Sequence, residues 1–297
     1  MSADLGDEDE PQGTLLALSV LENSPSRQDG ISQAVEIERR IWACELVQEA
    51  GILLKLPQVV MCTAQNLVHR FLYRKSLARF DAFTVAMGCF FLACKIEEKP
   101  KRIRETLFAF DFIWKRRTAQ ATEGKLELGG ARYNAWKAEL VKMERHVLKE
   151  LGFSFYIIDH AHKFILFYIK FLDGDRALAQ KAWSYLNDSM RLDVCLRHRA
   201  EVIACAAIFM GARALGIKLV VEEGWGWWDV FNVEKDELDT VVAAILGLYN
   251  LRPVGGLPVK WHEALCPKPH ITDADFDAQR AKLEPPPPPP PPPKPAE

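Results

Sequence analysis

The sequence predicts an all-α protein that contains two tandem five-helix repeats. Residues 83–94 hold no charge and no helix breaker except Gly88, so a helix here is apolar on every side and belongs at the centre of a helical domain. A membrane-spanning helix needs about 20 apolar residues, and this stretch is shorter. A second apolar stretch occupies residues 202–215, and a shift of 118 residues lays residues 85–95 on residues 203–213 with small and large residues matched. An internal duplication of a five-helix unit explains this match.

Four further segments of the first repeat carry apolar residues at helical spacing. They are residues 35–51, 57–72, 100–114 and 136–151. Residues that start, cap or end helices separate the predicted helices. These residues are Gly51, Pro57, Asp81, Pro100 and Gly152. Residues 115–131 contain three glycines and are expected to form a loop.

The second repeat shows the same order of segments. Asp159 is expected to cap a helix that runs to Leu172, a polar helix follows at residues 176–191, and the second apolar stretch comes next. A last helix at residues 234–248 is expected to have Asn232 as its cap. Before that helix lies an aromatic group, which we interpret as a plug over the core of this repeat rather than as a surface that stacks on bases. The group consists of Trp225, Trp227, Trp228 and Phe231.

The two repeats are expected to lie between two irregular ends. Residues 1–30 predict an acidic, mostly flexible leader, in which a short apolar run docks on the folded body. The first repeat is assigned to residues 31–153 and the second to residues 154–250. Residues 251–297 predict a proline-rich, disordered tail. Its nine consecutive prolines, Pro285 to Pro293, favour a polyproline II helix that SH3, WW or profilin-type domains could bind.

The composition favours an intracellular globular protein. Lys and Arg total 38 against 40 Asp and Glu, and a net charge of -2 is not typical of a general nucleic-acid binder. The seven cysteines are odd in number and form no C-x-x-C motif, which indicates buried thiols in a reducing compartment. The N-terminus has neither the basic nor the apolar region of a secretory signal. We therefore expect no membrane association and no direct contact with nucleic acid.

No motif for catalysis or for a cofactor is found. Gly224 and Gly226 lack the third glycine and the preceding strand of a dinucleotide-binding loop, and Walker, G-x-S-x-G and H-E-x-x-H motifs do not occur. His160 and His162 are two residues apart, so their rings do not share a helical face, and no third metal ligand is near. We expect a protein that is not an enzyme and that binds neither a metal nor a cofactor.

Two sequence blocks, in this order and spacing, resemble the cyclin family. The first apolar helix ends in Leu-Ala-Cys-Lys-Ile-Glu-Glu at residues 92–98, and residues 142–153 read Lys-Met-Glu-Arg-His-Val-Leu-Lys-Glu-Leu-Gly-Phe, like the fifth helix of a first cyclin box. The similarity covers residues 24–250, so the two repeats would be cyclin boxes. Within the family the chain looks most like the L type, which is associated with transcription and splicing. Four segments carry this closer resemblance: residues 49–57, 70–76, 99–104 and 187–191.

The resemblance implies a nuclear, non-catalytic activator of a cyclin-dependent protein kinase. In the family, the lysine and glutamate that match Lys95 and Glu144 form hydrogen bonds to kinase backbone beside a mobile kinase helix. The apolar residues that match Ile96, Leu148 and Phe153 pack on that helix. Glu144 and Leu148 are one turn apart and share a helical face, which agrees with this role. The complex would act in RNA polymerase II transcription and in pre-mRNA splicing.

Two departures keep alternatives open. The long Arg/Ser-rich C-terminal region of the L type is replaced by the proline-rich tail, which puts a splicing role in question and leaves the K and T types, which act in transcription elongation, as alternatives. A nucleic-acid-bound adaptor of the TFIIB kind uses a similar duplicated helical unit, but no cysteine for a zinc ribbon precedes Cys44. The basic residues at 99–104 and 115–117 are interpreted as a solvated edge or a kinase contact.

Overall fold

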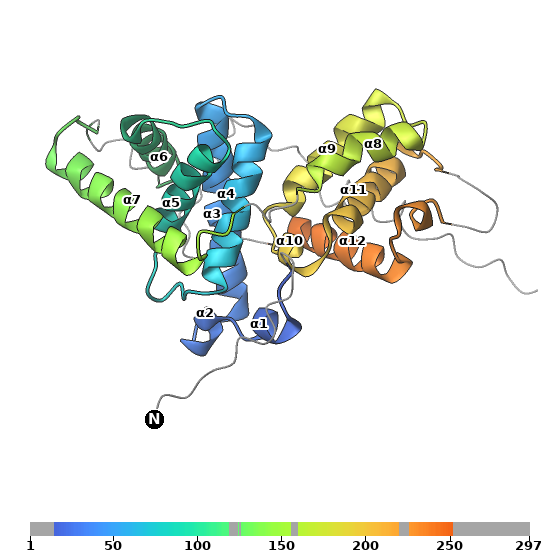
Figure 1. Cartoon of the computed structure of the whole chain (residues 1–297), viewed down its shortest axis with the longest axis horizontal. Coiled ribbons are helices and arrows are strands. Elements are labelled where there is room, and N and C mark those ends of the chain that lie inside the picture. Colours follow the sequence, from blue (N-terminus) through green and yellow to red (C-terminus); the bar gives the residue numbers. More distant parts are fainter. Residues whose placement is uncertain (1–14, 119–123, 125, 156–159, 220–225, 252–297) are drawn as a thin grey trace, which may run out of the picture.

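The computed structural model describes residues 15–118, 124, 126–155, 160–219 and 226–251, and this part of the chain is helical with no β-strand (Figure 1). The all-α prediction is therefore confirmed. The helices are α1 (Leu18–Glu22), α2 (Pro25–Gln28), α3 (Gln33–Leu53), α4 (Gln58–Leu72), α5 (Ala82–Ile96), α6 (Ile103–Thr118), α7 (Ala131–Glu150), α8 (His162–Phe171), α9 (Arg176–Ser189), α10 (Val194–Arg197), α11 (Ala200–Leu215) and α12 (Lys235–Asn250), with a 3-10 turn η1 (Asp229–Phe231).

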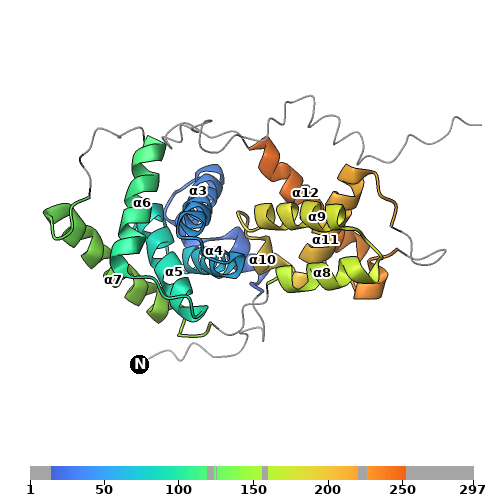
Figure 2. The same ribbon diagram turned by 90° about the horizontal axis from the view of Figure 1, so that it is seen from above.

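Helix α5 is the centre of the first repeat. It contacts α3, α4, α6 and α7, and Figure 2 shows it enclosed by these helices. Nearly all of its residues are buried, as its uncharged sequence predicts. Asp81 caps the helix, since one carboxylate oxygen accepts hydrogen bonds from the backbone N–H groups of Phe83 and Thr84 at 3.0 and 3.2 Å.

Helix α11 takes the same place in the second repeat. It is buried over most of its length and packs against α8, α9 and α12. The second repeat is predicted to have five helices. Where its fourth helix is expected, between α11 and α12, the described residues contain only the turn η1. Trp227 and Phe231 pack with the core of this repeat, in agreement with the interpretation of the aromatic group as a plug. Trp225 lies outside the described residues.

Several local predictions differ from the structure. Helix α3 continues through Gly51 to Leu53, and the N-cap of α8 is Ala161, while the expected cap Asp159 lies outside the described residues. Helix α6 continues to Thr118, so the expected loop begins later than residue 115. Pro57 lies at the N-cap of α4 rather than at its first helical position. Asn232 ends η1 in the left-handed conformation, and Glu234 is the N-cap of α12. Asparagine adopts a positive φ more readily than most residues, which explains why Asn232 can end a turn instead of capping the next helix.

The short apolar run of the leader docks on the folded body as expected, but the segment after it is also folded, because α1 and α2 pack against the repeats. Leu21 is buried beside Tyr73 of the first repeat and Leu196 of the second. The backbone N–H of Leu16 donates to the carbonyl oxygen of Leu196 at 2.8 Å. This segment therefore joins the repeats, and residues 1–14 and 252–297, including the proline run, lie outside the described residues.

A polar cluster joins the two repeats beneath this segment. Tyr73 donates a hydrogen bond to Asp193, and Arg197 forms an ion pair with the same carboxylate at 2.7 Å. Burial opposes the ionised form of Asp193, but the hydrogen bonds from Arg197 and Tyr73 outweigh it and lower its pKa. The guanidinium of Arg40 stacks over the Tyr73 ring at 3.9 Å. These contacts fix the two repeats relative to each other.

His69 is fully buried in the same contact between the repeats. Its Nε2 lies 3.1 Å from the carbonyl oxygen of Met190, so Nε2 carries the proton and donates it. Burial, and then the nearby Arg40 cation, lower the pKa of His69 from 6.5 to about 4. The ring is therefore neutral at physiological pH.

Acid is expected to destabilise the fold through His69. The unfolded chain binds a proton at this ring near pH 6.5 but the folded chain only near pH 4, so the unfolded state binds more protons between these values. The free energy of unfolding does not depend on this ring above pH 6.5, and it falls by on the order of 3 kcal/mol as pH approaches 4.

Urea unfolding over this pH window measures the effect. The His69→Gln variant should lose most of the pH dependence, with a smaller slope left by His162 and His198, whose pKa values burial also lowers. The same slope in both proteins would assign the acid sensitivity to other groups.

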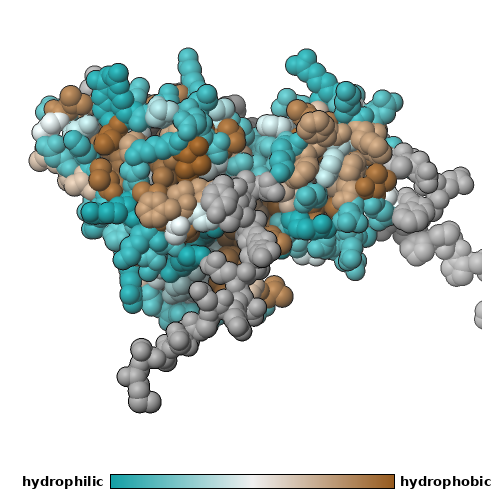
Figure 3. Space-filling view, viewed as in Figure 1, coloured by the Kyte–Doolittle hydropathy of each residue, from teal (hydrophilic) through white to brown (hydrophobic). Residues whose placement is uncertain are grey.

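Polar and apolar side chains alternate on the surface of the molecule (Figure 3). On the face seen in Figure 3, apolar side chains interrupt the polar surface over both repeats. Within the part of the chain that the structure describes, no helix combines the length and apolar character needed to cross a bilayer.

Candidate functional site

Lys95, in the last turn of α5, and Glu144, in the C-terminal half of α7, lie side by side on two packed helices. Lys95 Nζ is 2.5 Å from Glu144 Oε1, and it also lies 4.4 Å from the centre of the Phe91 ring. The Lys95 side chain is 46 % exposed and that of Glu144 is 12 % exposed. The structure thus brings the two residues together, with the lysine side chain half exposed and the carboxylate mostly buried. Their contact with a kinase remains a prediction.

The C-terminal end of α5 sets where Lys95 emerges. Glu98 adopts a left-handed φ of 53°, and the backbone N–H of Lys99 donates to the carbonyl oxygen of Cys94 at 2.8 Å. This bond closes the helix end in the manner of a left-handed cap. The helix therefore stops two residues after its last buried residue, Cys94, so Lys95 and Ile96 are carried to the surface on rigid backbone.

Gly88 allows α7 to approach α5 closely enough for the pair to form. A Cβ atom at Gly88 would lie 2.6 Å from Cγ of Met143 and 3.3 Å from the backbone nitrogen of Glu144. Any side chain at this position would push away the part of α7 that carries Glu144. The glycine in the apolar helix therefore has a packing role that acts directly on the site.

We expect Gly88→Ala to destabilise the first repeat by about 1–3 kcal/mol, because the added methyl group overpacks against α7. The matched control is Gly247→Ala on α12, where no atom lies within 4 Å of the new Cβ. That control should gain roughly 0.5–1 kcal/mol from helix propensity. Chemical denaturation of both variants measures the difference, and equal stability of the two would contradict the packing role.

Three apolar residues of the predicted site follow the pair along α5 and α7. Ile96 and Leu148 are partly buried against the core of the first repeat. Phe153 is 67 % exposed and has a left-handed φ of 58°, directly after Gly152 at φ 59°. A bulky residue in this region is strained, and strain of this kind gathers at functional sites. The five residues predicted from the sequence thus lie on α5, on α7 and directly after α7.

Sequence reasoning missed a chain of hydrogen bonds behind the site. The Thr63 hydroxyl donates to Glu97 Oε1 at 2.5 Å, and His160 Nε2 lies 2.8 Å from the same hydroxyl oxygen. Because the hydroxyl has one proton and Glu97 accepts it, His160 must donate. These two hydrogen bonds connect the end of α5 with the start of the second repeat. The residues that form them come from three distant segments, so no local pattern could have revealed them.

Part of the predicted basic edge has a different role. Arg117 is buried, with Glu45 at 3.0 Å and Glu49 as a second partner, and Arg116 also pairs with Glu49. Lys115 forms an ion pair with Asp111 at 2.7 Å. These cations tie α6 to α3 or to α6 itself, so residues 115–117 do not form an open surface for nucleic acid or a kinase.

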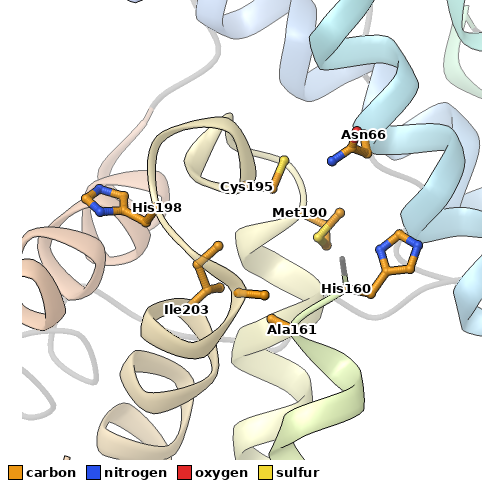
Figure 4. Close-up of a pocket in the computed structure, with 8 residues that line it drawn as sticks. Asn66, His160, Ala161, Met190, Cys195, His198 and Ile203 are labelled. Atoms are coloured by element: carbon orange, nitrogen blue, oxygen red, sulfur yellow. The ribbon is translucent and has the colours of Figure 1, made fainter. Parts of the chain in front are cut away.

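The histidines between the repeats do not converge on one point. A small cavity of about 20 Å³ lies there, with room for about one water molecule. Figure 4 shows His160 and His198 on opposite sides of this cavity, with Cys195 and Met190 between them. Among the described residues, no group of three or more His, Cys, Asp or Glu side chains is placed to hold a metal.

The cysteines of the described chain are free thiols, and most are buried. Burial raises the pKa of Cys62, Cys94, Cys195 and Cys205 to about 12. Thiols with such pKa values are poor nucleophiles at neutral pH. Their role is packing, as the sequence predicts.

Solved structures with a similar fold are kinase complexes. A chain from the crystal structure of the yeast RNA Pol II CTD kinase CTDK-1 complex matches with a TM-score of 0.64 and 16% identity, over 92% of this chain and 84% of that one. A chain from the CAK complex of Chaetomium thermophilum bound to ATP-gamma-S matches with a TM-score of 0.54 and 16% identity, over 90% of this chain and 78% of that one. At this identity the likeness shows the fold alone.

Sequence comparison gives a closer relationship. The family model for the cyclin N-terminal domain matches residues 16–156. Cyclin-L1-1 of Arabidopsis thaliana is 43% identical over 231 residues, which are 78% of this chain and 55% of the relative. Human Cyclin-L1 is also 43% identical, over 77% of this chain and 43% of its own length. The chain thus spans about half the length of these relatives. It is a cyclin-L-like protein with the helical fold of a cyclin.

Proposed function

We propose that this chain is the regulatory, activating subunit of a cyclin-dependent protein kinase that acts in RNA polymerase II transcription. Its similarity to Cyclin-L1 and the kinase complexes among its structural neighbours support this role. The observation that carries it is the ion pair of Lys95 and Glu144, together with the exposed ring of Phe153 just past the end of α7. The chain supplies position and no chemistry. A nuclear location, and a further role in splicing, follow from the same proposal.

The charged pair is suited to hold kinase backbone. Lys95 has three ammonium donors, and Glu144 offers two carboxylate oxygens, so each keeps bonding capacity after the 2.5 Å contact between them. A charged group forms stronger hydrogen bonds to backbone than a neutral one does. In the complex, the lysine would donate to a kinase carbonyl group and the carboxylate would accept from a kinase N–H group.

The apolar residues would then press on the mobile helix of the kinase. Phe153 is exposed just past the end of α7, while Ile96 and Leu148 are partly buried against the core of the first repeat. Covering Phe153 would remove its apolar surface from water, which offsets the strain of its backbone. Moving the kinase helix inward completes a different ion pair, between a lysine and a glutamate of the kinase itself, and that pair aligns ATP.

Affinity purification of the tagged chain from nuclear extract, followed by mass spectrometry, tests this function. We expect a cyclin-dependent kinase of the transcription class to be recovered in near-equal amount, with kinase activity that depends on the chain. A parallel purification of the Lys95→Ala, Glu144→Ala double variant is the control and should lose that kinase. Recovery of no protein kinase, or equal recovery with both proteins, would overturn the proposal.

The proline run has no part in this mechanism. Recognition of Pro285 to Pro293 by SH3, WW or profilin-type domains is a separate proposal that rests on the sequence alone.

A further inference from the structure

An aromatic groove opens on the first repeat, away from Lys95. It has a volume of about 270 Å³. Its walls are Phe83 and Met87 of α5, Trp114 of α6 and Trp136 of α7, and its rim carries the carboxylates of Asp81 and Glu139. Asp81 and Lys95 lie at opposite ends of α5, about 20 Å apart along the helix axis. The groove is therefore separate from the site described above, and its role does not depend on the proposed function.

The aromatic walls are built around Phe83. The rings of Trp114 and Trp136 lie 5.1 and 5.2 Å from the Phe83 ring, both edge-to-face. Such packing holds the two indoles at fixed angles, so the groove is formed before any ligand arrives. Its volume is slightly below the roughly 300–1,000 Å³ of small-molecule pockets, which favours a few side chains of a peptide over a cofactor.

The rim is negatively charged and keeps bonding capacity. Glu139 is more than half exposed, and its one ion pair in the described chain, with Lys142, is long at 3.5 Å and equally exposed. A pair of this kind contributes little. Among the described residues, the groove lining contains no basic side chain. The Trp136 ring already accepts a cation on one of its faces, since the guanidinium of Arg132 lies 5.0 Å from the ring centre.

Aromatic grooves with acidic rims suit one kind of peptide. Proline-rich segments bind such grooves because a polyproline II helix is already extended and loses little entropy on binding. A basic residue beside the prolines would complement the carboxylates. The chain carries both features in one place, since nine prolines end at Pro293 and Lys294 follows.

We propose that the segment from Pro285 to Lys294 of this same chain binds in the aromatic groove, with Lys294 at the carboxylates of Asp81 and Glu139. The connection is long enough. Helix α12 ends at Asn250, and the 34 residues between it and the prolines can span up to roughly 110 Å. A small domain is about 30 Å across, so two repeats in line measure about 60 Å.

The occupied groove can be detected by its tryptophans. We would label the 297-residue chain with 5-fluorotryptophan and compare its ¹⁹F resonances with those of a chain that ends at Glu284. The resonances of Trp114 and Trp136 should differ between the two chains, whereas that of Trp183 on α9 should not. A synthetic peptide of residues 284–297, added to the shorter chain, should restore the resonances of the longer one.

Charge reversal tests the direction of binding. Glu139→Lys should weaken binding of the added peptide about fivefold, as expected for an exposed ion pair. A peptide with Lys294→Glu should regain most of that loss on the Glu139→Lys chain. The matched control, Glu237→Lys on the exposed face of α12, should leave the affinity unchanged.

Three results would overturn the proposal. Identical resonances in the two chains, with no response to the peptide, would mean that the groove does not bind polyproline. Identical resonances with a response to the peptide would mean that the groove takes a proline-rich partner and not this segment of its own chain. Equal affinity for the unaltered chain and the Glu139→Lys variant would remove the groove as the binding place.

Discussion

Replacing Glu144 by alanine is expected to weaken kinase binding by about 1.5–3 kcal/mol, the usual contribution of a hydrogen bond with a charged partner. This corresponds to roughly 10- to 150-fold in the dissociation constant. The fold should hardly change, because Lys95 is 46 % exposed and water solvates it when its partner is removed. An exposed pair of this kind contributes only about 0.2–1 kcal/mol to stability. The variant therefore separates binding from folding.

Calorimetric titration with the purified kinase measures the loss. The control is Glu139→Ala on the same helix, which removes an exposed carboxylate five residues away on a different face. This control should bind the kinase like the unaltered chain. Kinase binding that survives the combined Lys95→Ala and Glu144→Ala changes would show that the wrong face has been assigned.

Phe90→Ala is expected to cost about 3–5 kcal/mol of unfolding free energy. Phe90 is fully buried on α5, and its ring lies 5.6 Å from that of Phe110 in an edge-to-face contact. Truncation leaves a cavity in the centre of the first repeat, where the five helices have little freedom to collapse. A loss of this size is a large part of the stability of a typical domain.

Urea denaturation followed by circular dichroism measures this effect. Phe112→Ala on α6 is the matched control, because that side chain is 49 % exposed and its loss should change stability by less than about 0.5 kcal/mol. Similar losses in the two variants would contradict the placement of α5 as the buried centre.

The sequence predicted the parts of the fold that depend on local pattern. An uncharged run such as residues 83–94 has one stable place in a soluble helical protein, and Asp81 caps it with the ordinary chemistry of its side chain. The docking of the apolar run that contains α1 was expected, but its place between the two repeats was not predictable in this way. Leu21 is buried only because Tyr73 and Leu196 from two different repeats meet there, and that meeting is a consequence of the assembled fold.

The site was predictable in part. The assignment of Lys95 and Glu144 to one site followed from a family resemblance and not from periodicity. The structure adds that they form an ion pair and that Gly88 allows their helices to come close enough for it. The left-handed backbone at Phe153 and the link from Thr63 to His160 depend on exact tertiary geometry. Charge alone was misleading at residues 115–117, because it does not show that Glu45 and Glu49 lie opposite.

The most direct test of the account is a cross-linking experiment at two exposed phenylalanines. A photoreactive phenylalanine analogue would replace Phe153, which is 67 % exposed just past the end of α7, or Phe167, which is 74 % exposed on α8 of the second repeat. Irradiation of cells that express each variant should cross-link position 153, but not position 167, to a cyclin-dependent kinase. A kinase cross-linked at position 167 and absent at position 153 would contradict the account.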